Sequence, residues 1–91
     1  MKGIYKLNFD CGRMGELTGI FISTKEDVKN IVGKDVYFGE VLGKHSEVYG
    51  TIDKGEIELV TNDKQAVEIF EKFSLSSGYN PFHYLSESEE E

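Results

Sequence analysis

Residue types that commonly build metal sites, disulfides and phosphate contacts are scarce in this sequence. It has one cysteine, Cys11, two histidines, His45 and His83, and one arginine, Arg13. A single cysteine excludes an internal disulfide and a Cys-rich zinc site, and a metal centre needs three or four converging ligands. Direct nucleic-acid binding is also disfavoured, because it needs clustered Lys and Arg. We therefore predict no metal, no cofactor and no direct nucleic-acid partner.

Long apolar runs are absent as well. Residues 1–6 lack the apolar stretch of about 7–15 residues that a signal peptide needs, and no run approaches the roughly 20 residues of a membrane span. Together with the lone cysteine, this predicts a cytoplasmic protein that binds no membrane. The length suits one domain, which we place at residues 1–85. Residues 86–91 are expected to form a disordered acidic tail.

The negative charge is unevenly distributed. The chain has a net charge of −7, and four of its 17 acidic residues lie in the last five positions. Without those four, 13 acidic residues (17 − 4) face ten basic residues, which leaves a net charge of −3. A solvated tail therefore explains much of the charge. A small acidic nucleic-acid mimic that inhibits its partner stays open as an alternative function.

The alternation of apolar and polar residues predicts the fold class. Strands are expected at residues 5–11, 17–22, 36–42, 47–53 and 57–60. Thr24 and Asp27 have the spacing of a capping box at the start of one short helix, and Asn62 can cap a second. The order ββαβββα predicts an α+β fold, in which a curved, mainly antiparallel sheet of about five strands carries both helices on one face.

Two groups of apolar residues need a cover or a partner. The second helix is expected to bury a stripe formed by Ala66, Ile69, Phe70 and Phe73. The sheet would then leave Ile4, Ile20 and Ile22 on its other face, where the chain's own C-terminal segment or a second copy could cover them. This excess of apolar surface predicts a homo-oligomer.

The C-terminal segment is rich in aromatic residues. Tyr79, Phe82 and Tyr84 occur within a few residues of each other, and large aromatic groups seldom remain in water without a partner. One interpretation is a strap that lies over the domain's own core. The other is an arm that docks on a second protein, with these three residues and Tyr49 as the partner-binding anchors.

The densest polar cluster lies at residues 39–50. Lys44, His45 and Ser46 occupy a turn between two predicted strands, and Glu40 and Glu47 flank that turn. The amide groups of a turn and a lysine can bind an anion together. If the loop that contains Arg13 lies at the same end of the sheet, these six residues form a site for a phosphate-bearing ligand. The alternative is a polar turn that faces water.

Two groups of residues could act as a nucleophile in catalysis, the turn at residues 44–46 and Cys11. Ser46, His45 and one of the neighbouring glutamates could form a hydrolase triad, but adjacent strand residues point to opposite faces, and no Gly-x-Ser-x-Gly elbow occurs. Cys11 alternates with the core residues of its strand, which favours a packing role. We therefore expect a protein that is not an enzyme.

Three segments carry a resemblance to known proteins. They are VYFGEVLGKHSEVYG at residues 36–50, FDCGRMGELTGIF at residues 9–21 and SGYNPFHYL at residues 77–85. The sequence resembles small proteins of phages and gut bacteria. The resemblance implies no catalytic residue. It implies a context in which such proteins inhibit host defence by capturing a protein or a signalling ligand.

The sequence thus predicts a non-enzymatic binding protein. It would sequester either a protein partner, through exposed aromatic anchors and acidic rim groups, or a small phosphate-bearing ligand. The nucleic-acid mimic and the hydrolase are the alternatives.

Overall fold

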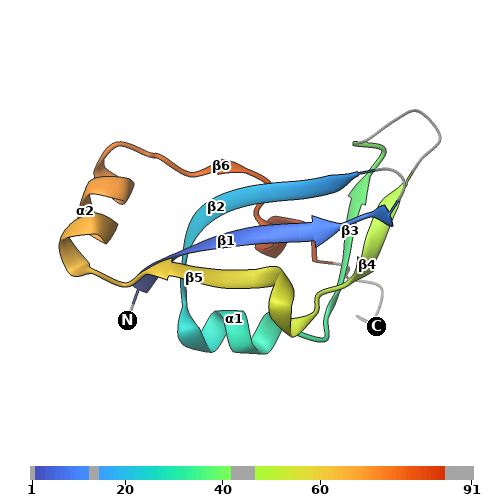
Figure 1. The fold of residues 1–91 in the computed structure, drawn as a ribbon, viewed down its shortest axis with the longest axis horizontal. Coiled ribbons are helices and arrows are strands. Elements are labelled where there is room, and N and C mark those ends of the chain that lie inside the picture. The colour runs from blue at the N-terminus through green and yellow to red at the C-terminus, as the bar shows by residue number, and fades with distance from the viewer. Residues whose placement is uncertain (1, 13–14, 42–46, 86–91) are drawn as a thin grey trace.

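The computed structural model describes residues 2–12, 15–41 and 47–85 (Figure 1). Its elements, in chain order, are β1 (Lys2–Asp10), β2 (Glu16–Thr24), α1 (Lys25–Ile31), β3 (Asp35–Gly39), β4 (Val48–Thr51), β5 (Ile57–Thr61), α2 (Lys64–Lys72) and β6 (Ser77–Gly78). Short 3-10 helices lie at Lys54–Glu56, between β4 and β5, and at Pro81–His83, after β6. Among the described residues, no helix is both long enough and apolar enough to cross a membrane.

The strands form two antiparallel sheets. The larger sheet has the order β5-β1-β2-β6, and β3 pairs with β4 in a separate two-stranded sheet, which we call the ribbon. In Figure 1 the ribbon lies at the end of the molecule opposite α2. The predicted α+β class and antiparallel pairing are confirmed. The structure adds one strand that was not predicted, β6 in the C-terminal segment. This strand has two residues only, which is too short to show an alternating pattern.

The two helices pack on different sides of the larger sheet, which differs from the expected arrangement. Ile31 of α1 belongs to the main core cluster with Leu7 and Phe21, whereas Val67 and Phe70 of α2 form a second cluster with Ile4. Successive strand residues point to opposite faces, so Ile4 faces the layer of α2 and Tyr5 faces the layer of α1. The order of the elements along the chain does not specify which face of the sheet α2 covers.

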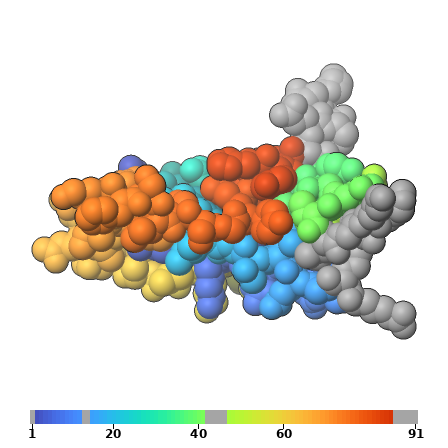
Figure 2. Space-filling model, turned by 90° about the horizontal axis from the view of Figure 1, so that it is seen from above, coloured from blue at the N-terminus to red at the C-terminus, as the bar shows by residue number. Residues whose placement is uncertain are grey.

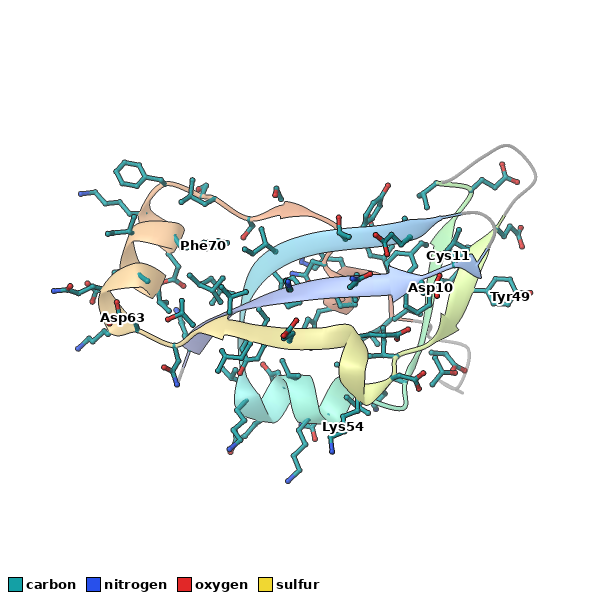
Figure 3. All side chains as sticks on the ribbon, in the orientation of Figure 1. Asp10, Cys11, Tyr49, Lys54, Asp63 and Phe70 are labelled. Carbon is teal, nitrogen blue, oxygen red and sulfur yellow. The ribbon has the colours of Figure 1, made fainter. Side chains whose placement is uncertain are left out.

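Helix α2 covers the apolar face that was expected to need another cover. Ile20 and Ile22 pack against the second cluster, beside Val67 and Phe70. Figure 3 shows Phe70 on the side of α2 that faces the sheet. The predicted homo-oligomer rested on this face being open, so the structure removes that argument for it.

The buried side of α2 is rotated from the predicted stripe. Val67 and Phe70 are buried and Ala66 is half-buried, whereas Ile69 and Phe73 are exposed. The sequence pattern accommodates two overlapping apolar stripes, and contact with Ile4 selects the one that contains Val67.

The helix starts follow the expected capping chemistry, with one shift. The Thr24 hydroxyl accepts a hydrogen bond from the Asp27 backbone N–H at 3.1 Å, as the capping pattern predicts. At α2 the cap is Asp63 and not Asn62, because the Asp63 carboxylate accepts from the Ala66 N–H at 3.3 Å.

The C-terminal segment folds back over its own domain. The Tyr79 N–H donates to the Thr18 carbonyl at 3.0 Å, and the Tyr37 N–H donates to the Tyr84 carbonyl at 2.9 Å. Figure 2 shows this orange-to-red segment passing along β2 and reaching β3, drawn in green. The segment lies over the domain's own core, as the strap interpretation predicted, and it also joins the two sheets.

Candidate functional site

The ribbon has one buried side and one outward side. Val36, Phe38 and Val48 point into the main core. The outward face of the ribbon consists of Asp35, Tyr37, Tyr49 and Thr51, all of which are exposed. This division follows from the alternation of side chains along each strand.

A bulge in β3 sets the pairing of the outward face. Tyr37 lies opposite Tyr49, but Gly39 lies opposite Val48, so β3 holds one extra residue, Phe38, at this point. Gly39 has a φ of 83°, a left-handed conformation that glycine adopts without steric cost. Beside the bulge, Phe38 lies in the core and Tyr37 lies on the outward face, opposite Tyr49.

Tyr37 and Tyr49 form a stacked pair on this face. Their ring centroids lie 6.3 Å apart, and the ring planes meet at 24°. Tyr37 is 48% exposed and Tyr49 is 66% exposed, so both rings are largely in water. Figure 3 shows Tyr49 projecting away from the rest of the molecule. The pair offers a flat aromatic surface that is already held in place before any partner arrives.

Polar contacts hold the edges of the outward face. The Thr51 hydroxyl donates to the Asp35 carboxylate at 2.7 Å. A side-chain hydrogen bond with Glu47 raises the pKa of the Tyr37 phenol, and the negative charges of Glu47 and Glu40 add to that increase. The phenol therefore remains protonated as a donor through the neutral range. Glu47 therefore lies beside the Tyr37 phenol, and Asp35 lies beside Thr51 on the same face.

An acidic cavity lies between the end of β1 and the inner edge of the ribbon. Its volume is about 510 Å³. Asp10, Glu47 and Glu56 provide its carboxylates, and its other lining residues are Phe9, Cys11, Val48, Tyr49, Gly50 and Thr51. The described lining includes no lysine or arginine, so the cavity favours cationic groups over anions.

The cavity also shows how the two predicted ligand loops are related. Cys11 lies just before the first loop and Glu47 just after the second, and both line this cavity. The described ends of the two loops therefore meet at one end of the molecule, as the anion-site hypothesis requires. Arg13, Lys44, His45 and Ser46 themselves lie outside the described residues, so that hypothesis stays a prediction.

Cys11 is a poor nucleophile in this setting. Burial raises the pKa of its thiol, and the negative charges of Asp10 and Glu56 raise it further. A raised pKa lowers the fraction of reactive thiolate at neutral pH. The thiol also lies 3.6 Å from the Phe9 carbonyl oxygen, to which it donates. These features are typical of a cysteine with a packing role.

No group of three or more His, Cys, Asp or Glu residues is arranged to hold a metal ion in the described part of the chain. Two of the three carboxylates that line the acidic cavity accept hydrogen bonds from separate backbone groups. Asp10 accepts from the Gly12 N–H at 2.9 Å, and Glu56 accepts from the Asp53 N–H at 2.8 Å.

The chain has no match in three comparisons. No protein-family model, curated protein or solved structure matches it. The resemblance to small phage and gut-bacterial proteins stays a prediction.

The predicted aromatic anchors fall into two groups. Tyr49 is exposed on the ribbon, as a partner-binding residue needs to be. Tyr79, Phe82 and Tyr84 are half-buried and pack against the main core of their own chain. The Phe38 ring lies 4.7 Å from Tyr84 and 5.9 Å from Tyr79, measured between centroids. These three residues are therefore strap residues here.

Sequence reasoning missed Tyr37. The hairpin predicted from the sequence, with strands at residues 36–42 and 47–53, would pair Tyr37 with Ile52. The pairing of Tyr37 with Tyr49 was therefore not expected. Gly39 signals the bulge, since a glycine inside a strand pattern often marks one, but the bulge accounts for only one of the three residues by which the register differs.

Proposed function

We propose that this chain is a non-enzymatic interaction module that binds a basic segment of a partner protein on the outward face of the ribbon. The observation that carries the proposal is the exposed, stacked pair of Tyr37 and Tyr49 with carboxylates at its edges. Exposed aromatic residues are the side chains that most often dominate binding energy at protein interfaces.

The charge around the pair selects the partner. Asp35, Glu47 and Glu40 are exposed on or beside the outward face, and the acidic cavity adds Asp10 and Glu56. A guanidinium or ammonium group can stack on a tyrosine ring and pair with a neighbouring carboxylate at the same time. An acidic partner would meet like charges in both places. The complementary surface therefore contains arginine or lysine.

The two tyrosines have different contributions. The backbone N–H of Tyr37 is bound to the Tyr84 carbonyl of the strap and its ring is stacked on Tyr49, so Tyr37 loses little freedom when a partner binds. Tyr49 is the more exposed ring and has the larger area to bury. Preorganisation of the first ring and burial of the second both favour binding.

The proposal is tested by selection from a displayed library of random peptides against the immobilised protein. We expect the selected peptides to be enriched in arginine or lysine. Their affinity should fall about tenfold or more in Tyr49→Ala, the effect of losing a central aromatic anchor. Added salt should also weaken the binding of the selected peptides, because it screens the attraction between their basic residues and the carboxylates around the tyrosine pair.

A matched control is available on the far side of the molecule. Phe73→Ala also removes an exposed aromatic ring, but from the end of α2. The selected peptides should bind this variant as tightly as the unaltered protein. Enrichment of acidic or purely apolar peptides, or equal losses in Tyr49→Ala and Phe73→Ala, would contradict the proposal.

A further inference from the structure

A second cavity lies at the opposite end of β1. It has a volume of about 370 Å³ and is formed by the start of β1, the end of β5 and the first turns of α1. In Figure 1 these three segments come together at the end of the sheet away from the ribbon. The lining residues are Lys2, Gly3, Tyr5, Lys25, Val28, Leu59 and Asn62.

The charge of this cavity is opposite to that of the acidic cavity. Two lysines, Lys2 and Lys25, line it, and none of its lining residues is acidic. This is unusual for a chain with a net charge of −7. The Lys2 amino group bonds to Glu71 at 2.8 Å, but both side chains of that pair are exposed. An exposed ion pair is weak, so a bound anion can compete for this lysine.

The floor of the cavity is apolar. Val28 and Leu59 line the cavity, and Gly3 lets Leu59 and the Tyr5 ring lie close to its backbone. A Cβ at position 3 would lie 3.1 Å from Leu59 Cδ1 and 3.3 Å from Tyr5 Cε1, so a larger residue there would displace these side chains. The floor therefore accepts an apolar group rather than an ion alone.

Tyr5 supplies a polar group within this floor. The residue is only 7% exposed, yet its hydroxyl has no side-chain hydrogen bond with any described residue. Tyr5 also lines the cavity, and its phenol is a side chain of the floor that can both donate and accept a hydrogen bond.

We propose that this cavity binds a small amphipathic anion, an apolar or aromatic body that carries one carboxylate or phosphate group. The anionic group would lie between the Lys2 and Lys25 amino groups. The body would cover Val28 and Leu59, and a polar atom of the ligand would pair with the Tyr5 hydroxyl. The volume is near the lower end of the range for small-molecule sites, which fits a ligand of about one ring.

The test is a titration of the full chain, followed by amide NMR shifts, with two anionic probes, phenyl phosphate and phenylacetate. Two reference compounds separate the two parts of the ligand. Inorganic phosphate has the anionic group without the ring, and benzyl alcohol has the ring without the charge. We expect both anionic probes to shift the amides of the cavity residues, and to bind more tightly than either reference compound. Tighter binding of phenyl phosphate would identify a phosphate ligand, and equal or tighter binding of phenylacetate a carboxylate.

Matched variants assign the binding to this cavity. Lys25→Gln should weaken the anionic probes about three- to tenfold, and Tyr5→Phe about threefold, as expected for a lost charged and a lost neutral hydrogen bond. Lys29→Gln removes a lysine of the same helix that does not line the cavity, so it should leave the affinity unchanged. Far-UV circular dichroism confirms that each variant is folded. Equal losses in Lys25→Gln and Lys29→Gln, amide shifts confined to other surfaces, or tighter binding of benzyl alcohol would each overturn the proposal.

Discussion

Gly19 of β2 and Gly78 of β6 lie opposite each other, and neither position has room for a side chain. A Cβ on Gly19 would overlap the carbonyl oxygen of Tyr79, and one on Gly78 would lie 2.7 Å from the Cα of Gly19. Gly78 also has a φ of 73°, which disfavours other residues. This contact lets the strap cross the edge of β2 and turn its aromatic side chains into the core.

The substitution Gly19→Ala should therefore loosen the strap. We expect a loss of about 1–3 kcal/mol in the free energy of unfolding, the usual cost of overpacking, measured by urea denaturation. Limited proteolysis within residues 74–79 should also become faster. Gly55→Ala is the control, since a Cβ there meets nothing within 4 Å. A loss in Gly55→Ala as large as that in Gly19→Ala would show that the close contact is not the cause.

Phe38 is the residue through which the ribbon, the strap and the main sheet contact one another. Its ring is 5% exposed and lies 5.5 Å from Phe9, in addition to its contacts with two strap tyrosines. Phe38→Ala should lower the free energy of unfolding by about 3–5 kcal/mol. Phe73→Ala removes the same atoms from a 62% exposed site and should cost less than about 1 kcal/mol. Similar costs by thermal or urea denaturation would contradict this core assignment.

The Cys11 thiol should react slowly. Burial and nearby carboxylates raise its pKa, so alkylation by iodoacetamide at pH 8 should be slower in the folded protein than in the same chain unfolded by guanidinium. The folded rate should then increase with pH, since more thiolate forms.

Asp10→Asn distinguishes the electrostatic cause from burial. Removal of this charge lowers the thiol pKa and should raise the alkylation rate at pH 8, whereas Glu26→Gln, a change on α1, should not. An unchanged rate in Asp10→Asn would assign the slow reaction to burial alone.

Tyr37 should ionise at an unusually high pH. The hydrogen bond with Glu47 requires the protonated phenol and raises the pKa of Tyr37 above the ordinary tyrosine value of about 10. A raised folded pKa means that this bond favours the folded state below about pH 10 and that its contribution is lost as the pH rises through the folded pKa. In a titration of absorbance at 295 nm, the component that disappears in Tyr37→Phe should have a midpoint above 10. A midpoint at or below 10 would show that the hydrogen bond is absent in solution.

The local chemistry of the chain was predictable to a large extent. The alternation of Tyr5, Leu7 and Phe9 predicted a half-buried strand, and the spacing of Thr24 and Asp27 predicted the start of α1. Such signals depend on residues within a few positions of each other. The α+β class followed from them, because it needs only the types and order of the elements.

The candidate site was predictable in part. Tyr49 was identified as an exposed anchor, but its stacking partner Tyr37 was not, because Tyr37 pairs with Tyr49 and not with Ile52, a register difference of three residues. A register shift changes every pair of the ribbon. The cavity lined by Lys2 and Lys25 was not predicted. Its lining residues, such as Lys2, Tyr5, Lys25 and Leu59, are spread over more than half of the chain and show no common motif.

The amino-acid pattern was sufficient to specify the approximate positions of β1 to β5 and of both helices, since these properties arise from residues close together along the chain. The face that α2 covers, the passage of the strap over β2, and the two oppositely charged cavities required the folded chain. Each depends on contacts between distant segments, such as Gly19 with Gly78 or Ile4 with Val67. Many distant pairings satisfy the same local preferences, and close packing selects among them.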